Sequence, residues 1–262
     1  GRPQCYVPPG APNPEAASLT SDATELIIRL ADLYPKKLVI FAIGPLSPLA
    51  AAMSTTRGLQ KLRWIRMLCI QGQTHVFSSE EKARFPLSPD FTAFNLREDK
   101  IAAERVFSQL QMHVPMLFLG KYAAYRVSLY RENFEAMDFI CGSNEMTEAA
   151  RRNLNVFRQG NPEQFYKLYP VPEDRRNDEE WFDEIDVLSH PYDALLILAF
   201  VQPDLFKMEI VGERHLLIGN RKEFHGVPDP GAVRHALCKW MEVGLSRERP
   251  AEMKCETFCS LI

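Results

Sequence analysis

Residues 37–43 read KLVIFAI, and they are followed at once by Gly44-Pro45 and by the small-residue segment 48–53. A continuous run of apolar and β-branched residues of this length is typical of a strand buried on both faces of a parallel sheet. Glycine and proline directly after such a run predict a tight turn. This stretch therefore predicts a strand, a turn and a helix in immediate succession, which is the beginning of a βαβ unit.

The same alternation extends in both directions from this stretch. Before it, apolar residues recur at helical spacing from Leu26 until Pro35, and Ser21 is a suitable N-cap. After it, we expect strands at 64–70 and 114–119, separated by an irregular stretch at 71–94 and a helix at 99–110. The other expected elements are helices at 129–137, 145–157, 162–169, 179–188, 192–201 and 231–245, and short strands at 207–211 and 215–218. This order predicts an α/β fold with a mainly parallel sheet flanked by helices.

Composition limits the class of protein. The 262 residues carry a formal net charge of −3, so the chain lacks the broad positive field that binding to nucleic acid requires. No apolar run approaches the roughly 18 residues that a membrane-spanning helix needs, so we expect no span. Six cysteines without C-x-x-C spacing indicate a reducing compartment. We therefore expect an intracellular protein, in the cytoplasm or in the lumen of an organelle.

The two ends of the chain differ in composition from the middle. Residues 1–20 are rich in proline and glycine, which predicts an extended lead-in, and residues 21–262 are expected to form a single domain. The last four residues, CSLI from Cys259, have the outline of a prenylation signal. Serine after the cysteine and isoleucine at the end fit that signal imperfectly, so we do not expect prenylation.

Three segments resemble motifs of the inosine-uridine nucleoside hydrolase family, in the same order along the chain. Residues 43–50 (IGPLSPLA) are similar to the family's L-G-P-L-T-N-L-A, and residues 94–103 (FNLREDKIAA) to its E-F-N-x-x-x-D-P-E-A-A. Residues 192–206 (YDALLILAFVQPDLF) are similar to H-D-P-L-A-V-A-Y-L-I-D-P-E-L-F. Together the matches cover roughly residues 22–220. The resemblance implies a nucleoside-hydrolase-like sheet with a ligand crevice at the carboxyl ends of its strands.

The resemblance also implies a calcium-dependent cleavage of the N-ribosyl bond, in which oxygen ligands hold the ion. On the matching positions, Asp193 corresponds to a calcium ligand, Asn95 to a sugar-binding residue, and a carbonyl near Cys69 or Ile70 to a main-chain ligand. The family's D-x-D-x-G-x-D-D loop, which supplies the other aspartates and the general base, is nowhere in the 262 residues, and neither is its strand. In addition, Ala93 replaces the glutamate that grips the ribose and Tyr192 replaces the histidine near the leaving base. We assign no catalytic residue, and Asp193 would be a vestigial ligand.

Simpler structural roles stand beside these assignments. Asp193 begins an apolar helix, where a carboxylate interacts favourably with the helix dipole, and Asn95 can cap or turn the chain before the next helix. Asp99 is most simply an N-cap. The acidic stretch 173–186 places Trp181, among other apolar residues, on one helical face, which indicates a solvated outer helix rather than a metal site.

Two functional hypotheses follow. The first is a degenerate nucleoside-hydrolase-fold protein without catalytic activity, serving as a binding or structural subunit of an oligomer or larger complex, with no cofactor and with a nucleoside as one conceivable ligand. The second is a calcium-dependent nucleoside hydrolase whose N-terminal catalytic loop lies outside this chain.

Overall fold

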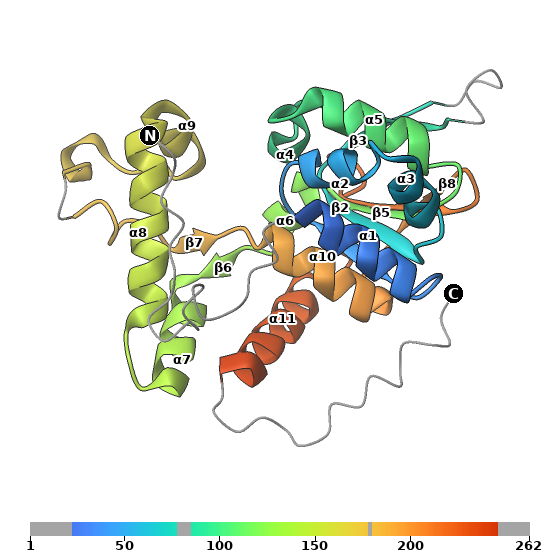
Figure 1. Ribbon diagram of the computed structural model, residues 1–262. Helices are drawn as coiled ribbons and strands as arrows, with labels where there is room; N and C mark the ends of the chain where they lie inside the picture. The colour runs from blue at the N-terminus through green and yellow to red at the C-terminus, as the bar shows by residue number, and fades with distance from the viewer. Residues whose placement is uncertain (1–22, 78–84, 178–179, 246–262) are drawn as a thin grey trace.

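The computed structural model describes residues 23–77, 85–177 and 180–245 (Figure 1). Their centre is a five-stranded sheet with the strand order β1-β2-β5-β9-β8. Its members are β1 (Val39–Ala42), β2 (Met67–Gln71), β5 (Met116–Leu119), β9 (His215–Ile218) and β8 (Glu209–Val211). The first four strands are parallel, in register from Val39↔Met67 to Ile218↔Leu119, and β8 alone is antiparallel. The predicted α/β fold with a mainly parallel sheet is therefore confirmed.

Helices cover both faces of this sheet, because successive residues of each central strand point to opposite sides. On one face, Leu68 and Phe118 pack against α1 (Ala23–Leu33), α2 (Ser47–Ala52), α3 (Thr56–Leu62) and α5 (Lys100–Leu110). On the other face, Cys69 and Leu117 pack against α6 (Lys121–Arg126), α10 (Tyr192–Val201) and α11 (Pro230–Leu245). The central strands are thus buried on both faces, as continuous apolar runs predict.

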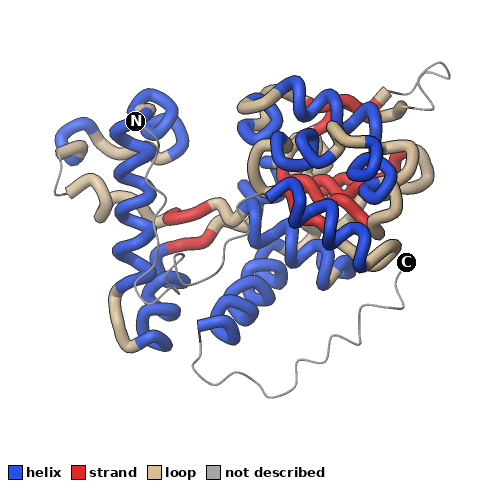
Figure 2. The backbone as a smooth tube through the Cα atoms, in the orientation of Figure 1, coloured by secondary structure: helices blue, strands red, loops and turns tan. Residues whose placement is uncertain are grey.

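A group of helices lies to one side of the sheet and is joined to it by two short antiparallel strands (Figure 2). These strands are β6 (Leu129–Tyr130) and β7 (Val187–Ser189), and the helices are α7 (Arg131–Cys141), α8 (Glu145–Gly160) and α9 (Pro162–Leu168). Short 3-10 turns, η2 (Glu173–Arg175) and η3 (Pro203–Leu205), lie in the connections. Phe165 and Trp181 belong to the same buried cluster as Leu117 of the sheet, so the helical group shares its core with one sheet face.

Two predicted elements were wrong. The helix expected at 179–188 is instead a set of turns followed by β7, although Trp181, Phe182, Ile185 and Leu188 are all buried as their spacing indicated. The helix expected at 129–137 begins only at Arg131, after the strand β6. Both errors have one cause, because β6 and β7 pair with each other across a long stretch of chain and local spacing carries no sign of that pairing.

The stretch 71–94 contains more order than expected. It holds the antiparallel pair β3 (Thr74–Val76) and β4 (Leu87–Pro89), and it ends in the short helix α4 (Phe94–Arg97). Asp99 is the N-cap of α5, since its carboxylate accepts a hydrogen bond from the Ala102 N–H at 3.0 Å, so that prediction is confirmed. The expected lead-in at 1–20 and the Cys259 motif lie outside the described residues.

Candidate functional site

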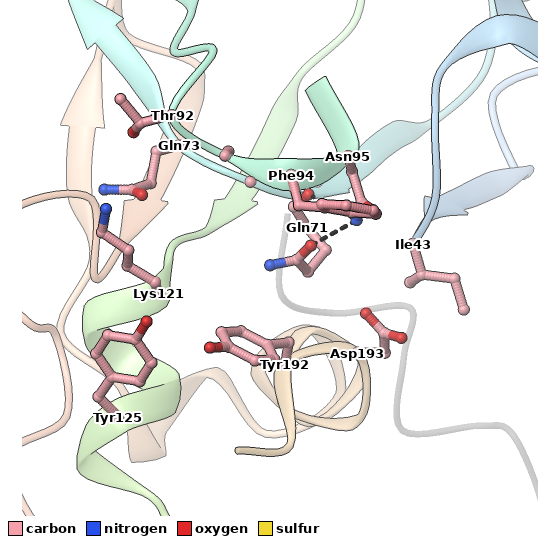
Figure 3. A pocket seen from close by; sticks show the side chains of 12 residues that line it. Ile43, Gln71, Gln73, Thr92, Phe94, Asn95, Lys121, Tyr125, Tyr192 and Asp193 are labelled. Carbon is pink, nitrogen blue, oxygen red and sulfur yellow. Dashed lines mark hydrogen bonds between the residues drawn. The ribbon is translucent and has the colours of Figure 1, made fainter. Parts of the chain in front are cut away.

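A cavity of about 420 Å³ opens at the carboxyl ends of β1, β2 and β5 (Figure 3). This edge of an open parallel sheet is where ligands bind in α/β proteins, because the loops that follow the strands meet there. The sequence predicted a crevice at this edge near Gly44, Gly72, Asn95 and Asp193. The last three residues line the cavity, and Gly44 is not among its lining residues. Its remaining wall consists of Ile43, Gln71, Gln73, Thr92, Ala93, Phe94, Lys121, Tyr125 and Tyr192.

Asn95 lies in α4 and is tied to the end of β2. Its side-chain nitrogen donates to the Gln71 side-chain oxygen at 2.5 Å and more weakly to the Gln71 carbonyl at 3.4 Å. Asn95 does not cap the following helix, because Asp99 does so. The amide pair of Asn95 and Gln71 instead faces the cavity, where it offers hydrogen bonds of the kind that sugar hydroxyls need.

Asp193 lies in the first turn of α10 and reaches the same cavity. The N-cap of this helix is Pro191 without a side-chain cap, so Asp193 has no capping role. The residue is exposed as a whole, but its carboxyl group is partly removed from water at the cavity wall, and this desolvation raises its pKa. The position of Asp193 in the first turn of α10 fits a dipole partner, and its role as a metal ligand stays a prediction.

Gln73 is held in place by Asn220, a residue that the sequence did not single out. The Gln73 side-chain nitrogen donates to the Asn220 carbonyl at 3.1 Å, and the Asn220 side chain bonds both the N–H and the carbonyl of Thr74 at 2.8 Å. The preceding residue, Gly219, has a φ of +63° and lies against α6, where a Cβ would overlap the backbone of Ala123. No local signal marks Asn220, since its role exists only once β9 lies beside β5.

Aromatic side chains form the wall between this cavity and the helical group. The rings of Tyr125 and Tyr192 lie 6.1 Å apart, and His190 lies 4.9 Å from Tyr125 and 6.2 Å from Tyr169. Burial lowers the pKa of His190, so its ring is neutral, and its Nδ1 lies 3.2 Å from the Ser128 hydroxyl. Burial and the neighbouring Tyr125 raise the pKa of Tyr192. The Tyr192 hydroxyl is therefore neutral near pH 7.

The described residues of the cavity do not fit a calcium ion. Calcium takes six to eight oxygen ligands and gains its affinity from several carboxylates. Here Asp193 is the one carboxylate of the wall, beside amides and hydroxyls. Within residues 23–77, 85–177 and 180–245, no group of three or more His, Cys, Asp or Glu side chains is placed to hold a metal. Cys69 and Ile70 lie inside β2 between two strands, and the cavity wall begins with the next residue, Gln71.

An open, mainly parallel sheet with a polar cavity at its carboxyl edge is an α/β architecture, and ligands of α/β proteins bind at this edge. No protein-family model and no curated protein sequence matches this chain. None of the helices in the described part of the chain is long and apolar enough to cross a bilayer.

Solved structures identify the fold more closely. The chain is similar to the effector protein XOO4466, with a TM-score of 0.64 and 18% sequence identity over 86% of this chain. It is also similar to the type III effector XopQ in complex with adenosine diphosphate ribose, with a TM-score of 0.65 and 19% identity over 85% of this chain. A third similar structure is a purine-preferring ribonucleoside hydrolase from Gardnerella vaginalis, with a TM-score of 0.52 and 15% identity over 85% of this chain. The chain therefore has the nucleoside-hydrolase fold, as its motifs indicated. It spans 65% and 63% of the length of the two effectors, which is less than two thirds of each.

Proposed function

We propose that this chain binds a ribosyl compound in the cavity at the carboxyl edge of its sheet without hydrolysing it, and that it serves as a binding subunit of an oligomer or larger complex. The observation that carries the proposal is that the cavity wall has several amide groups but only one carboxylate among its described residues. Amide groups suited to sugar hydroxyls are present at Asn95 and Gln71, whereas Asp193 is the single carboxylate. Hydrolysis needs a base that activates water, and the described wall offers none beside Asp193.

The structural relatives support a ligand of this class. XopQ is described in complex with adenosine diphosphate ribose, and the Gardnerella protein is named a ribonucleoside hydrolase. Both ligands contain a ribosyl group, which is the part that the retained amides would bind. Asn95 would contact the sugar, and Asp193 would accept one hydrogen bond from a hydroxyl rather than hold calcium.

The test is calorimetric titration of the chain with adenosine diphosphate ribose and with inosine, combined with an assay for released base, with and without calcium. We expect binding of at least one ligand and no release of base. Asn95→Ala should weaken binding about tenfold, because it removes hydrogen bonds made to the sugar, whereas Gln60→Ala, an exposed amide on α3, should leave it unchanged. Calcium-dependent release of base would overturn the proposal.

One observation favours the alternative, a hydrolase completed from outside this chain. Strand β1 is the edge of the described sheet, and its sequence VIFA contains no charge, proline or bulge of the kind that protects an edge. A further strand paired to β1 would end at the same edge of the sheet as the cavity if it ran parallel. A synthetic strand that carries D-x-D-x-G-x-D-D and restores calcium-dependent base release would favour this alternative; the same peptide without effect would count against it.

A further inference from the structure

Lys121 places a positive charge in the wall of the cavity without an opposite charge beside it. It is the first residue of α6 and half-buried, and its ammonium lies 5.4 Å from the ring centre of Tyr122. Among the residues that the structure describes, no carboxylate forms an ion pair with it. Lys121 and Asp193 lie on opposite sides of the cavity in Figure 3, so they do not neutralise each other. A half-buried cation that faces a polar cavity is suited to an anionic ligand.

The amide oxygen of Gln73, another residue of the cavity wall, is a second group without a partner among the described residues. Gln73 is only 4% exposed, and its Oε1 is buried with no hydrogen-bond donor in the described part of the chain. The side chain cannot simply rotate to find one, because its nitrogen is bonded to the Asn220 carbonyl. In Figure 3 Lys121 and the Gln73 amide lie on the same side of the cavity. Buried polar groups are nearly always paired, so an unpaired one at a cavity wall points to a partner that arrives with the ligand or moves with it.

We infer that the cavity selects a phosphorylated sugar, and that Lys121 binds its phosphate while Asn95 and Gln71 bind its hydroxyls. This inference rests on the proposed function and specifies its ligand class. An ammonium has three donors. On binding, these donors reach the phosphate.

The opposite wall sets the orientation of the ligand. A phosphate beside Asp193 would meet a like charge, whereas the uncharged hydroxyls of the sugar are compatible with that carboxylate. The cavity of about 420 Å³ has room for a pentose with one phosphate. A neutral nucleoside would fill the sugar position but leave Lys121 without its partner.

The experiment compares ribose 5-phosphate, ribose and inorganic phosphate by calorimetry on the whole chain at pH 7.5. We expect ribose 5-phosphate to bind about tenfold more tightly than either ribose or phosphate alone. One hydrogen bond to a charged group contributes about this much affinity. Lys121→Met should abolish this preference while leaving ribose binding within about twofold. Lys121→Arg should keep most of it, because the charge remains.

Lys167→Met is the matched control, since Lys167 is an exposed lysine on α9 outside the cavity, and it should change nothing. Equal binding of ribose and ribose 5-phosphate, or an unchanged preference in Lys121→Met, would overturn this inference and leave the proposed function standing. Inorganic phosphate that binds as tightly as ribose 5-phosphate would also overturn it, because the sugar would then contribute nothing. If no ribosyl ligand of any kind binds, including adenosine diphosphate ribose, the proposed function itself fails.

Discussion

His215 is a buried residue whose ionisation affects the stability of the described fold. It begins β9, is 1% exposed, and its Nδ1 has no hydrogen-bond partner in the described part of the chain. Burial, assisted by the positive charge of Arg214, lowers its pKa to about 4. The ring is therefore neutral in the folded chain at any pH above that value.

The expected consequence is a loss of stability in weak acid. The pKa of an unfolded histidine is about 6.5, so between that value and about 4 the unfolded chain binds a proton that the folded chain does not. Stability is fully present above pH 6.5 and falls as the pH drops through this window. From pH 7 to pH 5 this one group should lower the free energy of unfolding by about 2 kcal/mol.

Urea denaturation at pH 7 and at pH 5 measures this change in the free energy of unfolding. His215→Leu should reduce the difference between the two by about 2 kcal/mol, and His75→Leu, at an exposed position, should not. An unchanged pH difference in His215→Leu would show that another group is responsible.

At the scale of elements, the segment after η2 shows how a tertiary contact replaces a helix. The Arg131 guanidinium donates to the carbonyls of Phe182 and Ile185 and packs 4.5 Å from the Phe182 ring centre. Its backbone N–H donates to the Asp186 carbonyl at 2.7 Å. These carbonyls would otherwise accept bonds within a helix. One arginine of α7 therefore stabilises the turns that bury Trp181 and Phe182.

Arg131→Met should loosen this segment more than the rest of the molecule. The variant keeps an apolar stem but leaves two carbonyls without their charged donor, which should cost about 2 kcal/mol. Hydrogen exchange of residues 180–189 should accelerate, whereas Arg126→Met, an exposed arginine at the end of α6, should leave it unchanged. Uniform acceleration over the whole chain would indicate global destabilisation instead of a local role.

At the scale of the whole molecule, the sheet and the helical group share one core. The cluster that contains Leu117 and Leu119 of β5 continues without a break to Leu154 of α8, Phe165 of α9 and Trp181. Opening the helical group would break this shared cluster, so neither part can lose its packing without cost to the other. We therefore expect the chain to behave as the single domain predicted for residues 21–262.

Scanning calorimetry tests this expectation. One transition whose calorimetric and van't Hoff enthalpies agree is the expected result. Two separate transitions, with the lower one abolishing the near-ultraviolet signal of Trp181 alone, would make the helical group an independent unit. Trp181→Phe supplies the control that assigns the signal, since Trp64 and Trp240 are the other tryptophans.

The sequence by itself determined the parallel core and the position of the site edge. Continuous apolar runs at β1, β2 and β5 and the small residues after them are local properties, and so is the cap at Asp99. Asn95 and Asp193 were located through their motifs, and their roles as ligand-binding residues stay predictions. Only the tertiary structure decided the rest, because pairing of β6 with β7, the carbonyls held by Arg131 and the contact of Asn220 with Gln73 join residues distant in the chain. Such contacts leave no periodic pattern in the sequence, because the residues that they join are far apart in the chain.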